Sequence, residues 1–298
     1  MASILSRLAP VVITLRGSKW RFSRAERTLR QVERLQHHPV PFEPPVSLTR
    51  TVSVERRDVN GWPVYTLTAP DEASHRRALY LHGGCYVFEI DRIHWLVAAK
   101  LAVETGATVT VPIMPLAPRD TAVNIVPAVA DLAERLIAEV GAAGVTIIGD
   151  SSCGGMALAV AQVLRDRGHE PLGATVLISP WLDISGTDPR LAQIAPRDPW
   201  LAVPGTRAAG ALYRGDLDES DPLVSPIHGS LAGLGPITMF SGTRDILNAD
   251  ATRLVALAGA AGVPLEYHEG EGMIHNYPIL PMPEGDAARA QIVAAMLR

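Results

Sequence analysis

Two consecutive serines stand where a short apolar strand meets a helical pattern, a position suited to nucleophilic catalysis. The segment Gly149-Asp150-Ser151-Ser152-Cys153 follows the β-rich run from Val145 to Ile148. A serine hydroxyl attacks an acyl carbon when a histidine takes its proton and a carboxylate orients that histidine. The segment therefore indicates acyl transfer, provided that a histidine and a carboxylate are placed to help it.

Two registers of this turn are open. The residues two before and two after the nucleophile must be small at a sharp strand-to-helix turn. The register on Ser151 flanks it with Gly149 and Cys153, whereas the register on Ser152 puts Asp150 two residues before. We prefer Ser151, because an aspartate fits poorly in the tightest part of the turn. A helix N-terminus capped by two serines is the alternative without chemistry.

The carboxylate and the base each follow a later predicted strand. Asp245 comes after the apolar run from Ile237 to Ser241, and His275 comes after the run from Leu265 to His268. The order Ser, Asp, His is the chain order of α/β-hydrolases. Open α/β sheets also build their sites at the carboxyl ends of strands. These two positions therefore complete a triad with Ser151, whereas an aspartate after a strand is, on its own, most often a turn residue.

A glycine-rich segment ends an earlier strand and can supply hydrogen-bond donors. It reads His82-Gly83-Gly84-Cys85. Consecutive glycines let backbone N–H groups approach a developing oxyanion, at about 3–4 kcal/mol per donor. A plain β-turn is the alternative to this oxyanion-binding loop. We expect His82 to brace the loop rather than to act as the base.

The elements that must position these groups alternate between short apolar runs and longer helical patterns. This alternation predicts an α/β fold, with a mostly parallel central sheet flanked by helices. Asn60-Gly61 between two β-rich runs predicts a hairpin. The pattern stops between Trp181 and Pro226, which predicts an insertion over the sheet. Further elements are expected at Thr51 to Glu55, Pro63 to Thr68, Ala78 to Leu81, His94 to Thr105, Thr108 to Pro112, Val126 to Val140, Ala174 to Ile178 and Gly285 to Leu297.

Composition excludes several classes of protein. The 298 residues are 47% hydrophobic and 19% charged, which is too apolar for a disordered chain. A net charge of −4 gives no excess of basic residues to neutralise a phosphate backbone, so we expect no nucleic-acid partner. Two cysteines are too few for a disulfide scaffold, which favours a reducing, cytoplasmic location. Neither metal-ligand spacing nor a phosphate-binding glycine loop is found, so no metal and no cofactor is predicted.

The N-terminal segment is both apolar and basic. The run from Ile4 to Leu15 is shorter than the ~20 residues that span a bilayer and is interrupted by Arg7 and Pro10. No signal-peptide pattern follows it. The segment predicts either a mobile lid or a weak membrane contact.

The motifs together resemble the hormone-sensitive-lipase-like family of α/β-hydrolases, the bacterial esterases with an HGG motif. The resemblance runs from Tyr80 to the C-terminus. Its ordered motifs are His82-Gly83-Gly84, Pro115-Leu116-Ala117-Pro118, Gly149-Asp150-Ser151, Ser179 to Asp183, Asp221 to Pro226, Gly242 to Asp245 and Gly272 to His275.

The resemblance implies an α/β-hydrolase fold with a helical cap. The cap would comprise residues 1–45 and an insertion at 184–220, over a core of residues 46–183 and 221–298. Ser151 would be the nucleophile, Asp245 the acid and His275 the base. The backbones of Gly84, Cys85 and Ser152 would form the oxyanion hole, with Gly83 shaping the loop. The chain departs from the family at two positions. Cys153 stands where the family usually has glycine, and Cys85 stands where it often has glycine or alanine.

The sequence thus predicts a serine carboxylester hydrolase acting on small-molecule esters with short to medium acyl chains. A lactonase or amidase with the same triad is the alternative within enzymes. A non-catalytic small-molecule receptor on the same fold is the alternative outside enzymes. The resemblance also raises a homodimer as a hypothesis. Pocket residues are expected from the insertion, at Trp200, Leu201, Leu212 and Tyr213, and packing in the core is the alternative for these apolar side chains.

Overall fold

One eight-stranded sheet organises the protein, whose computed structural model describes residues 3–70 and 74–298. The strand order is β1-β2-β4-β3-β5-β6-β7-β8, with antiparallel pairing of β1 with β2 and of β2 with β4, and parallel pairing elsewhere. This confirms the predicted mostly parallel sheet. The strands are β1 (Ser53–Val59), β2 (Trp62–Thr68), β3 (Arg77–Leu81), β4 (Thr108–Pro112), β5 (Val145–Asp150), β6 (Ala174–Ile178), β7 (Ile237–Gly242) and β8 (Leu265–Gly270).

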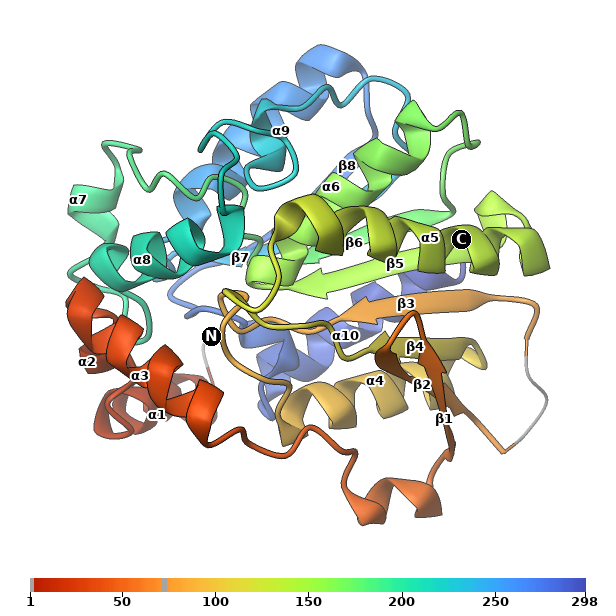
Figure 1. The fold of residues 1–298 in the computed structure, drawn as a ribbon, viewed down its shortest axis with the longest axis horizontal. Helices are drawn as coiled ribbons and strands as arrows, with labels where there is room; N and C mark the ends of the chain where they lie inside the picture. Colours follow the sequence, from red (N-terminus) through yellow and green to blue (C-terminus); the bar gives the residue numbers. More distant parts are fainter. Residues whose placement is uncertain (1–2, 71–73) are drawn as a thin grey trace.

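Helices cover both faces of the sheet (Figure 1). One face carries α4 (Arg92–Thr105) and α10 (Pro283–Met296). The other face carries α5 (Ala122–Val140), α6 (Ser152–Asp166) and α9 (Asn248–Ala261). Each layer buries its own apolar cluster against the strands, which are therefore apolar on both sides, as parallel strands usually are.

The remaining helices gather at the end of the sheet toward which the parallel strands point (Figure 1). They are α1 (Ile4–Leu15), α2 (Ser18–Phe22), α3 (Ala25–His37), α7 (Leu191–Ile194) and α8 (Val203–Arg214). The Lys19 ammonium donates to the carbonyl oxygens of Ala195 and Asp198, both at 2.6 Å. At Gly205, a Cβ would lie 2.4 Å from the Cα of Phe22, so α8 and α2 approach at backbone distance. The N-terminal helices and the insertion are thus attached to each other.

Local sequence signals explain some of the element ends but not others. Asn60 and Gly61 have φ of 53° and 84°, and they form the two-residue turn that the Asn-Gly pair predicts. The predicted start of α5 at Val126 was wrong, because the helix begins four residues earlier, at Ala122. Pro127 therefore lies inside the helix and not in its first turn. The helix keeps the extra turn because Ala122 and Ile125 are buried there.

Candidate active site

Ser151 lies between the last residue of β5 and the first residue of α6, in a backbone conformation that serine rarely adopts. Its φ is 55° and its ψ is −124°. Gly149 makes this turn possible, since a Cβ there would lie 1.9 Å from the carbonyl oxygen of Cys153. A glycine is therefore needed two residues before Ser151, which favours that register. Ser152 begins α6, and its buried hydroxyl has no hydrogen-bond partner in the described part of the chain.

The three residues expected to form the triad lie in one hydrogen-bonded line. The Nε2 of His275 is 2.9 Å from the Oγ of Ser151, and its Nδ1 is 2.8 Å from the Oδ2 of Asp245. All three side chains are buried. Burial lowers the pKa of His275, but the charge of Asp245 and its hydrogen bond outweigh burial, so the pKa is raised from 6.5. This geometry can take a proton from Ser151 and stabilise the resulting imidazolium.

A second buried carboxylate, from Asp198 of the insertion, lies beside the acid. Its Oδ2 accepts the N–H of Ile246 at 2.9 Å, and its Oδ1 accepts those of Trp200 and Leu201 at 2.7 and 2.9 Å. Burial and then the charge of Asp245 raise the pKa of Asp198 to about 6, against the effect of these three donors. The ring of Trp200 meets that of His275 edge to face, with centroids 5.5 Å apart. The insertion therefore helps to position both the acid and the base.

The glycine-rich loop after β3 turns through three consecutive residues with positive φ. Gly84 has φ of 139°, Cys85 of 53° and Tyr86 of 64°. The N–H of Gly83 donates to the Oδ1 of Asp150 at 3.1 Å and is not available to a substrate. Within the described chain, the backbone N–H groups of Gly84, Cys85 and Ser152 donate no hydrogen bond. These are the three donors that the resemblance assigned to the oxyanion hole, and Gly83 shapes the loop.

Asp150 connects this loop to the rest of the site, and sequence reasoning missed its role. Besides Gly83, it accepts the hydroxyl of Tyr80 at 3.1 Å and the side-chain amide of Asn276 at 2.8 Å. The Nε2 of His94 lies 3.3 Å from its Oδ2. Burial opposes charge on both groups, but their attraction prevails: the pKa of Asp150 is lowered and that of His94 is raised to about 10. An aspartate at the end of a buried apolar strand was the available signal.

His82 lies where the sequence analysis expected a bracing residue. Its Nδ1 is 2.9 Å from the carbonyl oxygen of Gly83, one residue along the chain. Burial, and then the neighbouring charge of His94, lower the pKa of His82 to about 4. A neutral ring that donates through Nδ1 fits this contact, and it holds the start of the glycine-rich loop.

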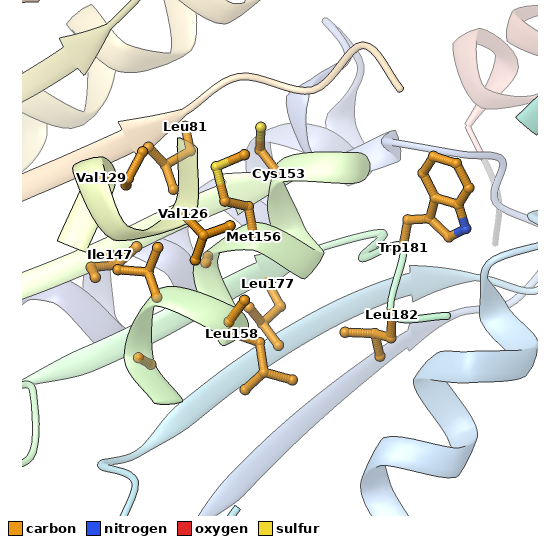
Figure 2. Packing of buried hydrophobic residues seen from close by; sticks show 14 of the residues in the cluster. Leu81, Val126, Val129, Ile147, Cys153, Met156, Leu158, Leu177, Trp181 and Leu182 are labelled. Atoms are coloured by element: carbon orange, nitrogen blue, oxygen red, sulfur yellow. The ribbon is translucent and has the colours of Figure 1, made fainter. Parts of the chain in front are cut away.

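Cys153 occupies the position at which the family usually has glycine, without disturbing the turn. Its side chain points into the core beside Leu81 and Met156 (Figure 2). The close approach of α6 to its neighbours falls one and two residues later. A Cβ at Gly154 would lie 2.8 Å from the Cα of Pro180, and one at Gly155 would lie 1.9 Å from a backbone oxygen. The two following glycines therefore provide the room that the helix needs.

A cavity of about 320 Å³ opens onto Ser151, His275 and the glycine-rich loop. Residues from α1 and α2 line one side of it, and Trp200 and Leu201 from the insertion line another. The other two residues expected to line it do not. Leu212 packs against the core, and the buried ring of Tyr213 stacks on Tyr86 with centroids 3.5 Å apart. The prediction was confirmed for Trp200 and Leu201, which precede α8. It was wrong for Leu212 and Tyr213, because the face of α8 that carries them packs against the core.

Within residues 3–70 and 74–298, no group of three or more His, Cys, Asp or Glu side chains is placed to bind a metal ion. No helix in these ranges has the length and apolar character needed to cross a bilayer.

The chain is similar to several known proteins. Residues 78–279 match the family model of the alpha/beta hydrolase fold. The chain is 34% identical to a triacylglycerol lipase of Mycobacterium tuberculosis over 76% of its own length and 48% of the lipase, so it spans about half of that relative. It is 34% identical to an acetyl-hydrolase of Streptomyces hygroscopicus, over 77% of each chain.

A solved structure extends the likeness to the whole chain. It is an esterase from the bacterial hormone-sensitive lipase family, with 28% identity, a TM-score of 0.84, and coverage of 100% of this chain and 99% of that one. The chain therefore belongs to the α/β-hydrolase family, among the hormone-sensitive-lipase-like esterases and lipases, as its sequence motifs predicted.

Proposed function

We propose that the protein hydrolyses small-molecule carboxylic esters with short to medium acyl chains, through an acyl-enzyme on Ser151. The observation that carries the proposal is the line of hydrogen bonds from Ser151 through His275 to Asp245, facing a cavity. The names of the relatives, which include an esterase, an acetyl-hydrolase and a triacylglycerol lipase, support ester hydrolysis. The intact triad favours an enzyme over a receptor on the same fold.

Acylation uses the groups as they lie. The Oγ of Ser151 attacks the acyl carbon while the Nε2 of His275 takes its proton, and the charge of Asp245 stabilises the imidazolium. The acyl oxygen becomes an oxyanion, for which the N–H groups of Gly84, Cys85 and Ser152 are free donors. When the tetrahedral intermediate collapses, the bond to the leaving oxygen breaks and His275 returns the proton to the departing alcohol.

Deacylation repeats these steps with water. His275 takes a proton from the water, the hydroxide attacks the acyl-enzyme, and Ser151 leaves with the proton that His275 returns. The acid product carries one oxygen from water, so the sum is the addition of water across the ester bond.

The size of the cavity limits the acyl chain. Its volume of about 320 Å³ is at the small end of ligand pockets, which run to roughly 1,000 Å³. Apolar side chains such as Phe22, Trp200 and Leu201 line it. We therefore expect kcat/KM to peak at short acyl chains and to fall toward decanoate.

Initial rates on p-nitrophenyl esters from acetate to decanoate test the proposal. We expect Ser151→Ala to lower kcat/KM by at least about 1,000-fold, because the nucleophile is lost. Ser152→Ala is the matched control: it keeps the backbone N–H, and we expect its rates within about three-fold of the wild type. Loss of activity in Ser152→Ala alone would move the nucleophile to the other register. A folded wild type that cleaves none of these esters would contradict the proposal.

A further inference from the structure

Helix α1 exposes its apolar stripe, which is the opposite of what a surface helix usually does. With about 100° of rotation per residue, six of its seven large apolar side chains fall within about 120° of one another. These six are exposed, from 45% at Val12 to 82% at Leu15, whereas Ile13 lies on the opposite side and is buried. The stripe comprises Ile4, Leu5, Leu8, Val11, Val12 and Leu15.

The structure holds this orientation from the other side of the helix. Ser6, Pro10 and Ile13 are the buried residues of α1. Glu284 at the start of α10 accepts the N–H of Ser3 at 2.6 Å, the hydroxyl of Ser3 at 2.8 Å and the hydroxyl of Ser6 at 2.9 Å. The stripe is therefore the face that α1 turns away from the protein.

The segment that carries the stripe has only basic charges of its own. Arg7 borders it on one side and Arg16 on the other, and both are exposed. Arg21 and Arg24 follow, and residues 3–25 contain no aspartate or glutamate. None of these four arginines forms a salt bridge among the residues that the structure describes. Trp20 is also exposed, at 61%, and aromatic rings of this kind favour the headgroup region of membranes.

The same segment borders the candidate active site. Ile13, Arg16, Arg21 and Phe22 line the cavity that opens onto Ser151. A surface in contact with the stripe would therefore lie close to the residues that line that cavity.

We propose that α1 docks the protein on an anionic lipid surface, lying in the plane of the interface. The apolar stripe would enter the acyl region, and the flanking arginines would contact lipid phosphates. At 12 residues, the helix is too short to span a bilayer. A second copy of the chain fits this face poorly, because a two-fold contact would bring Arg7 and Arg16 of both copies together with no acidic partner from the segment. The proposal concerns binding and does not rest on the proposed ester hydrolysis.

Flotation with vesicles of ether-linked lipids tests it, since these lipids contain no acyl ester that the protein could cleave. The protein is mixed with phosphatidylcholine vesicles, or with vesicles containing about 30% phosphatidylglycerol. We expect binding to the anionic vesicles only, with the bound fraction falling as salt increases. The double variant Leu8→Ser/Leu15→Ser should bind about 100-fold more weakly. Arg7→Gln should bind about five-fold more weakly.

Leu257→Ser, which removes an exposed leucine from α9, is the matched control and should bind like the wild type. Circular dichroism and hydrolysis of a soluble ester should be unchanged in Leu8→Ser/Leu15→Ser, which separates lipid binding from folding and from catalysis. Unchanged binding by this double variant, or no binding of the wild type to anionic vesicles, would overturn the proposal. So would light scattering that gives a dimer for the wild type and a monomer for the double variant, because the stripe would then join two copies.

Discussion

Asp198 belongs to the insertion, yet its carboxylate acts on the base of the candidate triad. Its charge is one of those that raise the pKa of His275, after the larger effect of Asp245. Its three hydrogen bonds also fix the backbone on either side, at Ile246 and at Trp200 and Leu201. Asp198 is therefore a positioning residue with an electrostatic effect that can be measured separately from its structural one.

Replacing Asp198 with asparagine should move the acid limb of the pH profile of kcat/KM to lower pH. The base must be neutral to take the proton of Ser151, so the limb follows the pKa of His275. Removal of one nearby negative charge lowers that pKa. Rates on a soluble p-nitrophenyl ester across the acid range give the measurement.

If Asp198 had only a structural role, Asp198→Asn would lower the rates at every pH and leave the acid limb of the profile where it is in the wild type. Asp250→Asn is the control, because Asp250 is another buried carboxylate, whose pKa burial and the charge of Asp183 raise to about 7. Among the described residues, Asp250 forms no hydrogen bond or salt bridge with the triad, so the acid limb of Asp250→Asn should coincide with that of the wild type.

The sequence allowed part of the candidate site to be predicted, and particular residues show which part. Ser151, Asp245 and His275 each follow a strand, and parallel strands bring their carboxyl ends to one edge, so their proximity follows from the α/β pattern. Asp150 and His94 could not be paired in this way. Their contact depends on the packing of α4 beside the end of β5, which local sequence does not specify.

The turn from β5 into α6 is the element on which the site depends most. Gly149 has no room for a side chain, because the carbonyl oxygen of Cys153 occupies the position of a Cβ. That oxygen belongs to the helix backbone, which cannot move aside without changing the position of Ser151.

We expect Gly149→Ala to lower the free energy of unfolding by about 2 kcal/mol or more, because β5 and α6 must separate to make room for the methyl group. The same shift should lower activity by at least about 100-fold. Thermal unfolding and ester hydrolysis measure the two effects. The control is Gly259→Ala in α9, where a Cβ would meet nothing within 4 Å. This change should stabilise the protein by about 0.5–1 kcal/mol and leave activity unchanged. Wild-type behaviour of Gly149→Ala would show that the turn can relax.

Element boundaries were predictable where a local signal dominates. The Asn60-Gly61 turn and the apolar run of β6 are such cases. The start of α5 was not, since Pro127 favours a helix beginning nearby, whereas burial of Ala122 and Ile125 extends the helix. Helix α9 was not predicted at all, because its alanine-rich sequence has no sharp amphipathic pattern.

At the scale of the whole molecule, the pair of His94 and Asp150 joins α4, β5, the glycine-rich loop and the loop after β8. The pKa of His94 is raised from 6.5 to about 10 in the folded protein. Its contribution to stability is therefore fully present below pH 6.5 and is lost as the pH rises through about 10.

Urea unfolding between pH 6.5 and 10 should show this loss, and His94→Gln should show a smaller loss over the same range. Buried tyrosine and cysteine side chains with raised pKa also lower the free energy of unfolding of both proteins as the pH rises. The effect of His94 is therefore the difference between the stability curves of the wild type and His94→Gln. His169→Gln is the control, because His169 contacts Glu134 at 2.9 Å near the surface. Parallel curves for wild type and His94→Gln would mean that the pair does not carry charge.

The attachment of α1 has a consequence for the order in which the protein is made. Ser3 leaves the ribosome before its partner Glu284, which is synthesised 281 residues later. At roughly 5–20 residues per second, this interval is about 15 to 55 s. During this interval, the apolar and basic segment of α1 is outside the ribosome without Glu284, the acidic residue that fixes its orientation. The nascent chain therefore presents this segment to chaperones and nearby surfaces long before the finished protein can hold it in place.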